Sequence, residues 1–345
     1  MRIVWPAAYY GRHRGSFVPA VERVARRALE RGDSFDVVLP DLGPLPWHDE
    51  LRALGAGVHV VRAYDARAAA LRTRALRPDV VHAHFDGWLV TLTLVLWPSR
   101  ARVLWHLHST FEPGGGPLRF TARRAIKFRL VGRRVARFVA VTETIAAEAR
   151  RLGVPESKLA VVRNAVDGAR FHPPGTAARA AARGRLELGD APAIAFFGRD
   201  PALKGADVLA AALAQTPGIT VVAIATPAGA LAEIAARARV VAVPLLDDVR
   251  EVLWAVDALA LPSRGEGMPF VALEALACGV PVLAGGLPWA VELARTNPGV
   301  ALAPSGDAEA FGAALHALLA APPPAAAGAA ADLDAWASAI LALYG

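Results

Sequence analysis

Two glutamates frame a predicted loop-to-helix junction in the C-terminal half of the sequence. Glu266 lies in a glycine-containing loop after an apolar strand segment at residues 258–261, and Glu274 lies inside the helix predicted over 270–278. The first turn of a helix favours an anion by ~0.3–1 kcal/mol, and glycines let a ligand approach the backbone closely. Carboxylates repel phosphate, so Glu266 and Glu274 are expected to bind ligand hydroxyls. Residues 265–274 therefore predict a site for a phosphorylated ligand rich in hydroxyls.

A second loop, residues 198–205, follows the strand predicted over 193–197 and carries two cations. Arg199 and Lys204 lie five positions apart, and Lys204 is the only lysine of residues 176–345. A charge-assisted hydrogen bond contributes about 1.5–3 kcal/mol, so two such cations can stabilise a departing diphosphate without a metal. The alternative is an ordinary solvated loop. The spacing favours a diphosphate site.

Four histidines form two H-x-H pairs, His82 with His84 and His106 with His108, near the ends of two predicted strands. Side chains alternate along a strand, so both members of a pair face the same side. Imidazole is a zinc ligand, which makes a metal site one interpretation; a sugar-contacting or catalytic histidine and a buried structural pair are the others. His108 is the favoured functional residue because it ends its strand and precedes Ser109 and Thr110.

The elements that position these residues alternate between strand and helix. This alternation predicts βαβ units and a doubly wound parallel sheet, and the pattern occurs twice. The segment 167–188, rich in Ala, Arg and Gly, is predicted to be a loop at the domain boundary. The domains are therefore predicted as 1–170 and 171–332, followed by a docking helix over 333–345. Ligands bind at the carboxyl ends of such strands, so we expect the site in the cleft between the domains.

Charge is divided unevenly along the sequence. Residues 1–175 hold 28 Lys and Arg against 15 Asp and Glu, whereas residues 176–345 are net acidic. A basic helix is predicted over 121–136, with aromatic and aliphatic residues among its arginines. Such helices lie on anionic membranes, so we expect contact with an anionic surface or a charged acceptor; an Arg-rich surface without a specific partner is the alternative. No recognition motif supports binding to nucleic acid.

The sequence has few features typical of a membrane-spanning or disulfide-bonded protein. The most apolar stretch, residues 88–97, falls well short of the ~20 residues that span a bilayer. The N-terminal residues lack the pattern of a signal peptide, and the single cysteine, Cys278, cannot form an internal disulfide. We therefore expect a cytoplasmic protein that touches the inner face of the membrane peripherally through residues 121–137.

Taken in order, these segments resemble the retaining glycosyltransferases of the GT-B fold, specifically family 4, over nearly the whole chain. The segments that carry the resemblance are D-V-V-H-A-H at 79–84, H-S-T at 108–110, V-T-E at 141–143, R-N-A-V-D at 163–167, G-R at 198–199 with K-G at 204–205, and E-x7-E from Glu266 to Glu274 followed by A-L-A-C-G-V-P-V at 275–282. The resemblance implies an α/β chain with two Rossmann-like doubly wound domains facing each other across a cleft.

The resemblance also implies a role for each matching residue. His108 and Glu266 would act on the donor sugar as the catalytic pair, and Glu274 would bind the nucleotide ribose. The residues that would bind the donor are Gly15, Arg199, Lys204, Gly267, Met268, Pro269, Phe270 and Glu274. The residues on the acceptor side would be His84, Thr110 and Asn164. No metal and no cofactor are expected.

The implied activity is transfer of a sugar from a nucleotide-sugar to a hydroxyl of a saccharide, a glycolipid or a small metabolite. A UDP-sugar is favoured over a GDP-sugar because it is the commoner donor in the family. The sequence departs from the family pattern in its first loop, which is reduced to Gly15-Ser16, at Ala165, and at Pro269, which has no amide proton to donate. The alternatives are a metal-dependent hydrolase built on the four histidines and a nucleotide-sugar-binding protein without transfer activity.

Overall fold

The computed structural model describes residues 1–109, 118–323 and 332–345, with side chains described from residue 124 onward in the second segment. The chain divides into two compact units, Met1–Asn164 with Leu333–Gly345, and Ala165–Asp332. The boundary predicted at residue 170 lies six residues after this division. Val166 bridges Asp332, and the Arg170 guanidinium donates to the Asp247 carbonyl oxygen at 3.2 Å. These contacts join residues 165–170 to the second unit.

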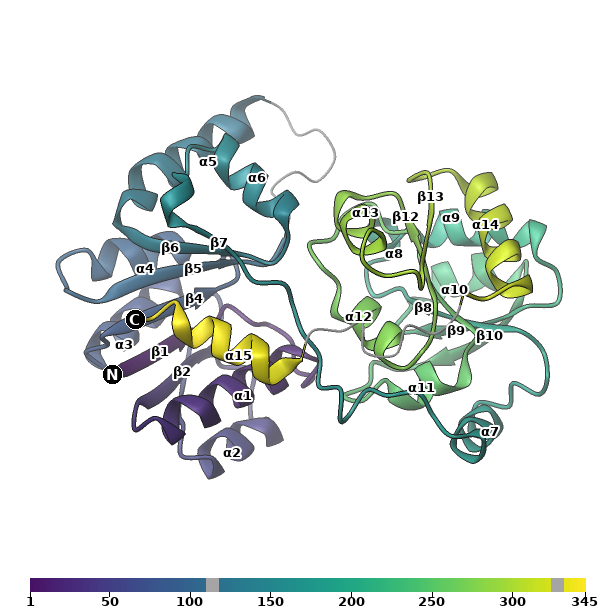
Figure 1. Ribbon diagram of the computed structural model, residues 1–345, viewed down its shortest axis with the longest axis horizontal. Helices are drawn as coiled ribbons and strands as arrows, with labels where there is room; N and C mark the ends of the chain where they lie inside the picture. Colours follow the sequence, from purple (N-terminus) through teal and green to yellow (C-terminus); the bar gives the residue numbers. More distant parts are fainter. Residues whose placement is uncertain (110–117, 324–331) are drawn as a thin grey trace. The chain divides into compact units, whose positions relative to one another are not determined.

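The first unit is built on a parallel sheet whose strand order, within the described residues, is β3-β2-β1-β4-β5-β6-β7 (Figure 1). Its central strands are short apolar runs buried along almost their whole length, as expected for a sheet covered on both faces. The strands are β1 (Arg2–Pro6), β2 (Ser34–Pro40), β3 (Gly57–Val61), β4 (Val80–His84), β5 (Arg102–Leu107), β6 (Val135–Ala140) and β7 (Leu159–Val161).

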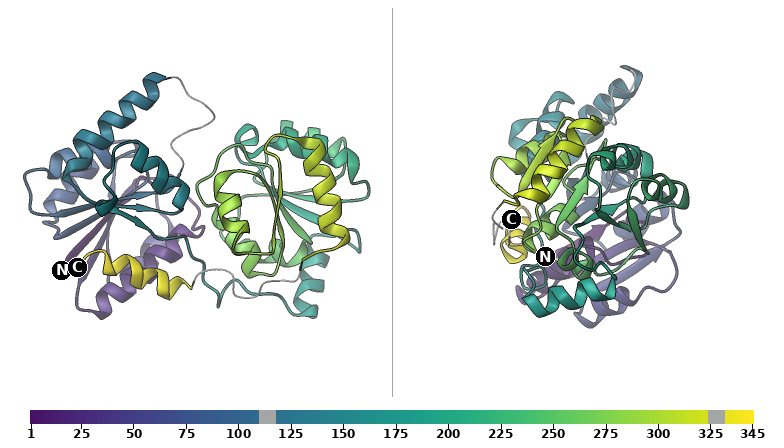
Figure 2. Two further views of the ribbon diagram at one scale, coloured as in Figure 1. Left: turned by 45° about the horizontal axis from the view of Figure 1, so that its top comes forward. Right: turned by 90° about the vertical axis from the view of Figure 1, so that its right-hand side faces the viewer.

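The last helix of the chain, α15, lies along α1 in this unit, as Figures 1 and 2 both show. Arg27 donates to the Asp334 carboxylate from Nε at 2.9 Å, and Arg23 also pairs with Asp334. The helices of the first unit are α1 (Phe17–Glu30), α2 (Pro46–Ala53), α3 (Ala66–Ala75), α4 (Leu89–Leu96), α5 (Leu118–Leu130), α6 (Glu143–Arg151) and α15 (Leu333–Ala342), with 3-10 turns η1 (Val131–Arg134) and η2 (Glu156–Lys158).

The second unit has a parallel sheet with the order β10-β9-β8-β11-β12-β13 in the described residues. The strands are β8 (Ala193–Phe197), β9 (Thr220–Ile224), β10 (Arg239–Val243), β11 (Ala258–Leu261), β12 (Val282–Gly285) and β13 (Val300–Ala303). The helices are α7 (Thr176–Arg185), α8 (Pro201–Lys204), α9 (Ala206–Ala212), α10 (Ala228–Ala235), α11 (Arg250–Ala255), α12 (Phe270–Ala277), α13 (Pro288–Ala294) and α14 (Ala308–Ala320), with the 3-10 turn η3 (Leu213–Gln215).

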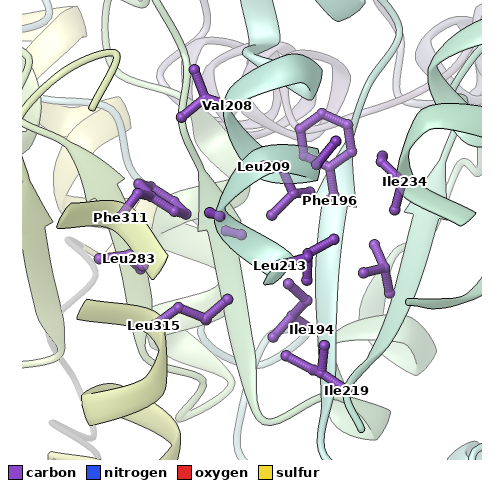
Figure 3. Packing of buried hydrophobic residues seen from close by; sticks show 14 of the residues in the cluster. Ile194, Phe196, Val208, Leu209, Leu213, Ile219, Ile234, Leu283, Phe311 and Leu315 are labelled. Atoms are coloured by element: carbon purple, nitrogen blue, oxygen red, sulfur yellow. The ribbon is translucent and has the colours of Figure 1, made fainter. Parts of the chain in front are cut away.

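The hydrophobic core of the second unit lies where α9, α10 and α14 cover the sheet (Figure 3). Phe196 of β8 and Leu283 of β12 meet Leu209 of α9 and two residues of α14, Phe311 and Leu315, and all five are almost completely buried. Packing on this face fixes β8 and α9. It thereby fixes the loop between them, which carries Arg199 and Lys204.

Two expectations about local structure are wrong. Residues 167–188 are not all loop, because α7 spans Thr176–Arg185 and its arginines bond to the neighbouring α11–β11 segment; Arg179 reaches the Asp257 carboxylate at 2.5 Å. The basic helix does not continue to residue 136, because α5 ends at Leu130 and β6 begins at Val135. Arg134 instead donates to the carbonyl oxygens of Ser99 and Ala101.

The helices α2 and α13 and the strand β13 were not foreseen from the sequence. Each of them is short, at eight residues or fewer, and α2 and α13 each start with a proline that can be read equally well as part of a loop. In the part of the chain that the structure describes, none of the helices has both the length and the apolar character needed to cross a bilayer.

Candidate functional site

An ion pair joins the two predicted donor-binding loops of the second unit. Lys204 ends α8, and its ammonium group donates to the Glu266 carboxylate in the loop that follows β11. Ser263 donates from Oγ to the same carboxylate oxygen at 3.2 Å. The Lys204 side chain is 26% exposed and that of Glu266 is 13% exposed. The pair is therefore partly shielded from water yet open to a ligand.

Close backbone packing sets the distance between these two loops. Gly205, with φ of +72°, is so near β11 that a Cβ atom there would lie 2.2 Å from the Pro262 carbonyl oxygen. The amide of Arg264 donates to the Leu203 carbonyl oxygen at 2.8 Å, and the Arg264 side chain pairs with Asp207. Because β8 and β11 are neighbours in the sheet, both loops leave its carboxyl edge side by side.

The remaining predicted donor residues flank this ion pair along the chain. Arg199 is exposed, and among the described residues it has no hydrogen-bond or ion-pair partner. Gly267 and Met268 are buried, whereas Phe270 is half-buried. Pro269 is the N-cap of α12, with φ of −67° and ψ of 124°. The helix therefore begins at Phe270.

Glu274 lies inside α12 and is 6% exposed, so its side chain is buried. Burial raises the pKa of the nearby Cys278 thiol to about 12, and the Glu274 carboxylate adds to the effect. Cys278 is thus a protonated, buried thiol at neutral pH.

The four histidines of the first unit gather on one face of β4 and β5. His84 lies directly opposite His106 in the register of the two strands. The ring centroids of His82 and His106 are 5.1 Å apart, and those of His84 and His106 are 4.8 Å apart. His82 bonds from Nδ1 to the Tyr344 hydroxyl at 2.7 Å, and that hydroxyl also accepts the Trp5 indole N–H at 2.8 Å.

His108 is the member of this set that follows the strand, directly after Leu107. Its Nε2 lies 3.0 Å from His84 Nδ1, and its ring stacks on His106 at 4.3 Å and on Phe85 at 4.4 Å. Burial lowers the pKa of His82 and of His108 to about 3. Burial also lowers the pKa of His84 and His106 well below 6.5, so all four imidazoles are neutral at pH 7.

The other predicted residues of the first unit lie in different settings. Gly15 has φ of +49° in the loop before α1, where a Cβ atom would lie 3.4 Å from the Tyr9 hydroxyl. Asn164 is 5% exposed and is the last residue of its segment of the unit. Thr110 lies outside the described residues. Among the predicted site residues of the first unit, His84 and His108 contact each other.

Three further residues were missed by the sequence analysis. Ser263 holds the Glu266 carboxylate, and Tyr344 holds His82. Tyr64 is 80% exposed with φ of +62°, and its ring stacks on Tyr10 at 4.4 Å. Position along the sequence could have indicated Ser263 and Tyr64, because each lies within three residues of the end of a strand. Tyr344, by contrast, lies far from His82 in the sequence, and no spacing rule joins them.

Two family models match the chain. One, described as Glycosyltransferase Family 4, matches residues 18–170, and the other, described as Glycosyl transferases group 1, matches residues 191–321. Curated relatives include the D-inositol 3-phosphate glycosyltransferase of Jonesia denitrificans, 37% identical over 262 residues that make up 64% of this chain and 60% of the relative. The enzyme of that name from Mycobacterium tuberculosis is 32% identical over 305 residues, 79% of this chain and 59% of the relative.

The chain spans about half the length of the curated relatives it matches. Solved structures match it throughout. HepE of Anabaena, in complex with UDP-glucose, covers 100% of this chain and 97% of its own, with a TM-score of 0.78 and 17% identity. WaaG, a glycosyltransferase involved in lipopolysaccharide biosynthesis, covers 97% and 93%, with a TM-score of 0.70 and 15% identity. Together with the two parallel-sheet units, these matches show that the chain belongs to the family 4 glycosyltransferases of the GT-B fold.

Proposed function

We propose that this chain is a retaining glycosyltransferase that moves a sugar from a nucleotide-sugar to an acceptor hydroxyl without a metal at the donor site. The observation that carries the proposal is the Lys204–Glu266 ion pair, supported by Ser263, at the carboxyl edge of the second sheet. This edge is where ligands bind in open α/β sheets. The solved HepE complexes with UDP and UDP-glucose support a UDP-sugar as the donor.

The ion pair gives the two loops separate roles when a donor enters. The diphosphate competes with Glu266 for the Lys204 ammonium, and Arg199 adds a second positive charge that is not committed elsewhere in the described residues. The released Glu266 carboxylate then accepts hydrogen bonds from the sugar hydroxyls. The bond from the anomeric carbon to the diphosphate oxygen breaks, and the cations stabilise the negative charge that develops there.

The new bond forms from the acceptor oxygen to the same face of the anomeric carbon. The acceptor proton passes to the departing diphosphate oxygen, which leaves as a nucleoside diphosphate. In this proposal His108 contacts the donor sugar, and the buried Glu274 in α12 serves the nucleotide ribose. Thr110 and Asn164 stay proposals for the acceptor side, whereas the side chain of His84 is only 1% exposed and offers no surface to an acceptor.

For the acceptor we propose a polyol that carries a phosphate. Relatives are named for D-inositol 3-phosphate, and the first unit holds most of the arginine in the chain. An anionic acceptor fits that charge, because arginine binds phosphate through two parallel hydrogen bonds. A saccharide or a lipid-linked acceptor with phosphate groups fits the same surface.

A melting screen with nucleotide-sugars tests the donor proposal. A ligand present at about 100 times its dissociation constant stabilises the folded protein by ~2.7 kcal/mol, so a UDP-sugar is expected to raise the melting temperature by several degrees. GDP-sugars and free uridine are the comparisons. If no nucleotide-sugar shifts melting in the wild type, the donor proposal fails. Release of nucleotide by the stabilising donor then separates a transferase from a binding protein without activity.

We also propose that α4 and α5 contact an anionic membrane surface. Leu94, Trp97, Ile126 and Leu130 are large apolar side chains that are exposed on the first unit. The helix α5 also carries arginines in its sequence. Apolar side chains set among cations are the pattern of a helix that lies at a lipid interface.

Vesicle sedimentation tests this contact. Binding is expected to rise with the fraction of anionic lipid and to fall several-fold when Ile126 and Leu130 are both replaced by serine, because two exposed apolar side chains are then lost. A matched control is Leu203→Ser, since Leu203 is an exposed leucine of the second unit. Binding that ignores lipid charge, or that is equal in both variants, removes the membrane proposal.

A further inference from the structure

The histidine cluster of β4 and β5 contains buried nitrogen atoms that no protein group satisfies. Nε2 of His82, Nε2 of His84 and both ring nitrogens of His106 have no hydrogen-bond partner in the described residues. All three side chains are at most 1% exposed. Buried polar groups in native proteins are nearly always paired, so a group of four such nitrogens in one place indicates a ligand at that place.

Hydrogen bonds hold the Nδ1 atoms of two of these rings. His82 is held through Nδ1 by Tyr344, and His84 is held through Nδ1 by His108. Histidines that bind metals show this same pattern, with one nitrogen anchored by a second group and the other directed at the ion. Imidazole binds in its neutral form, and these rings are neutral because they are buried among aromatic side chains such as Trp5.

The spacing of the three rings suits one small ion. One nitrogen from each of His82, His84 and His106 lies within 4.8 Å of the others. Tetrahedral zinc with bonds of about 2.0–2.1 Å places its ligand nitrogens about 3.4 Å apart, so loading draws the rings together by roughly an ångström. Loading must also turn the rings, because His82 and His106 lie nearly parallel, with 13° between their planes, and the lone pair of an imidazole nitrogen lies in the plane of its ring.

We propose that His82, His84 and His106 bind a divalent transition metal, with Zn²⁺ as the fitting ion, inside the first unit. This site belongs to a different unit from the Lys204–Glu266 pair. The ion clamps β4 to β5. It also fixes a tautomer, because a metal on His84 Nε2 leaves the proton on Nδ1, which donates to His108 Nε2. The other ring nitrogen of His108, Nδ1, then carries the proton of that ring.

Metal titration of the full chain tests the proposal. Protein stripped with a chelator is expected to bind one Zn²⁺ per chain and to show the visible absorption bands of tetrahedral Co²⁺ when cobalt is added. Zinc is also expected to raise the melting temperature. His106→Leu is the decisive variant, because His106 has no hydrogen bond to lose and leucine suits a buried apolar position. This variant should fold with at least the stability of metal-free wild type and lose the cobalt bands and the zinc shift.

The control is His59→Gln, which alters a half-buried histidine of β3 that bonds to Asp36 outside the cluster. It should bind zinc as the wild type does. Wild-type protein without bound zinc or cobalt bands would overturn the proposal, as would equal binding by His106→Leu. Either result leaves the donor-site proposal intact, because nucleotide-sugar binding is measured separately by the melting screen.

Discussion

Replacing Lys204 with methionine is expected to lower kcat/KM for sugar transfer about 10²–10³-fold, the usual effect of removing one group that stabilises developing charge. Methionine keeps most of the length of the side chain and removes the ammonium that pairs with Glu266. The diphosphate then loses its cation, and Glu266, 13% exposed, keeps a charge without its partner. Steady-state release of nucleotide and thermal melting, measured on the same preparation, separate lost chemistry from lost folding.

Arg264→Met is the matched control. Arg264 lies two residues before Glu266, and its guanidinium pairs with Asp207, whose carboxylate is largely exposed. An exposed pair contributes about 0.2–1 kcal/mol, so this variant should keep transfer within a few-fold of the wild type. Equal losses in the two variants would mean that charge anywhere in the loop matters. The specific role of Lys204 would then be withdrawn.

Gly205→Ala is expected to destabilise the second unit by ~3 kcal/mol or more, a value at the upper end for single substitutions. An alanine at φ of +72° pays about 1–2 kcal/mol for the left-handed conformation alone. The added Cβ would also lie 2.2 Å from the Pro262 carbonyl oxygen, which is backbone of the neighbouring loop and cannot rotate away. The two donor loops must separate, so transfer should fall together with stability in denaturant titrations.

Gly306→Ala separates the two contributions. Gly306 has φ of +82° in the turn before α14, and a Cβ atom there meets nothing within 4 Å. Only the conformational cost of about 1–2 kcal/mol should appear, with transfer unchanged. If both alanine variants lose the same free energy of unfolding, the close approach of Gly205 to Pro262 does not contribute to the cost of Gly205→Ala.

The parallel sheets and the main helices followed from periodicity, because short buried runs such as 193–197 and 258–261 are typical of strands in an α/β chain. The strand over 193–197 and the helix start near Phe270 were found to within a residue. Segment 167–188 was misjudged because alanine and arginine carry no apolar stripe. The helix α7 is instead held by Arg179 and Arg183 bonding to carbonyls and to Asp257, which are contacts between segments distant in the sequence.

The sequence predicted which residues belong to the candidate site, but not which of them contact each other. The positions of Lys204 and Glu266 at strand ends followed from the sequence, but their ion pair depends on β8 lying next to β11, and strand order is not encoded in spacing. The same limit applies to the histidines. The pairing of β4 with β5 brings His84 beside His106, and the contact of Tyr344 with His82 depends on where α15 docks.

The central claim is that Lys204 and Glu266 carry sugar transfer from a nucleotide-sugar, and product analysis with the donor chosen by the melting screen tests it most directly. Nucleotide release and the anomeric configuration of the product would be followed together, by coupled assay and proton NMR, for the wild type, Lys204→Met and Glu266→Ala. We predict release of a nucleoside diphosphate, a product that keeps the donor's anomeric configuration, and loss of both signals in the two folded variants. Full transfer by either variant, or a product of inverted configuration, would contradict it.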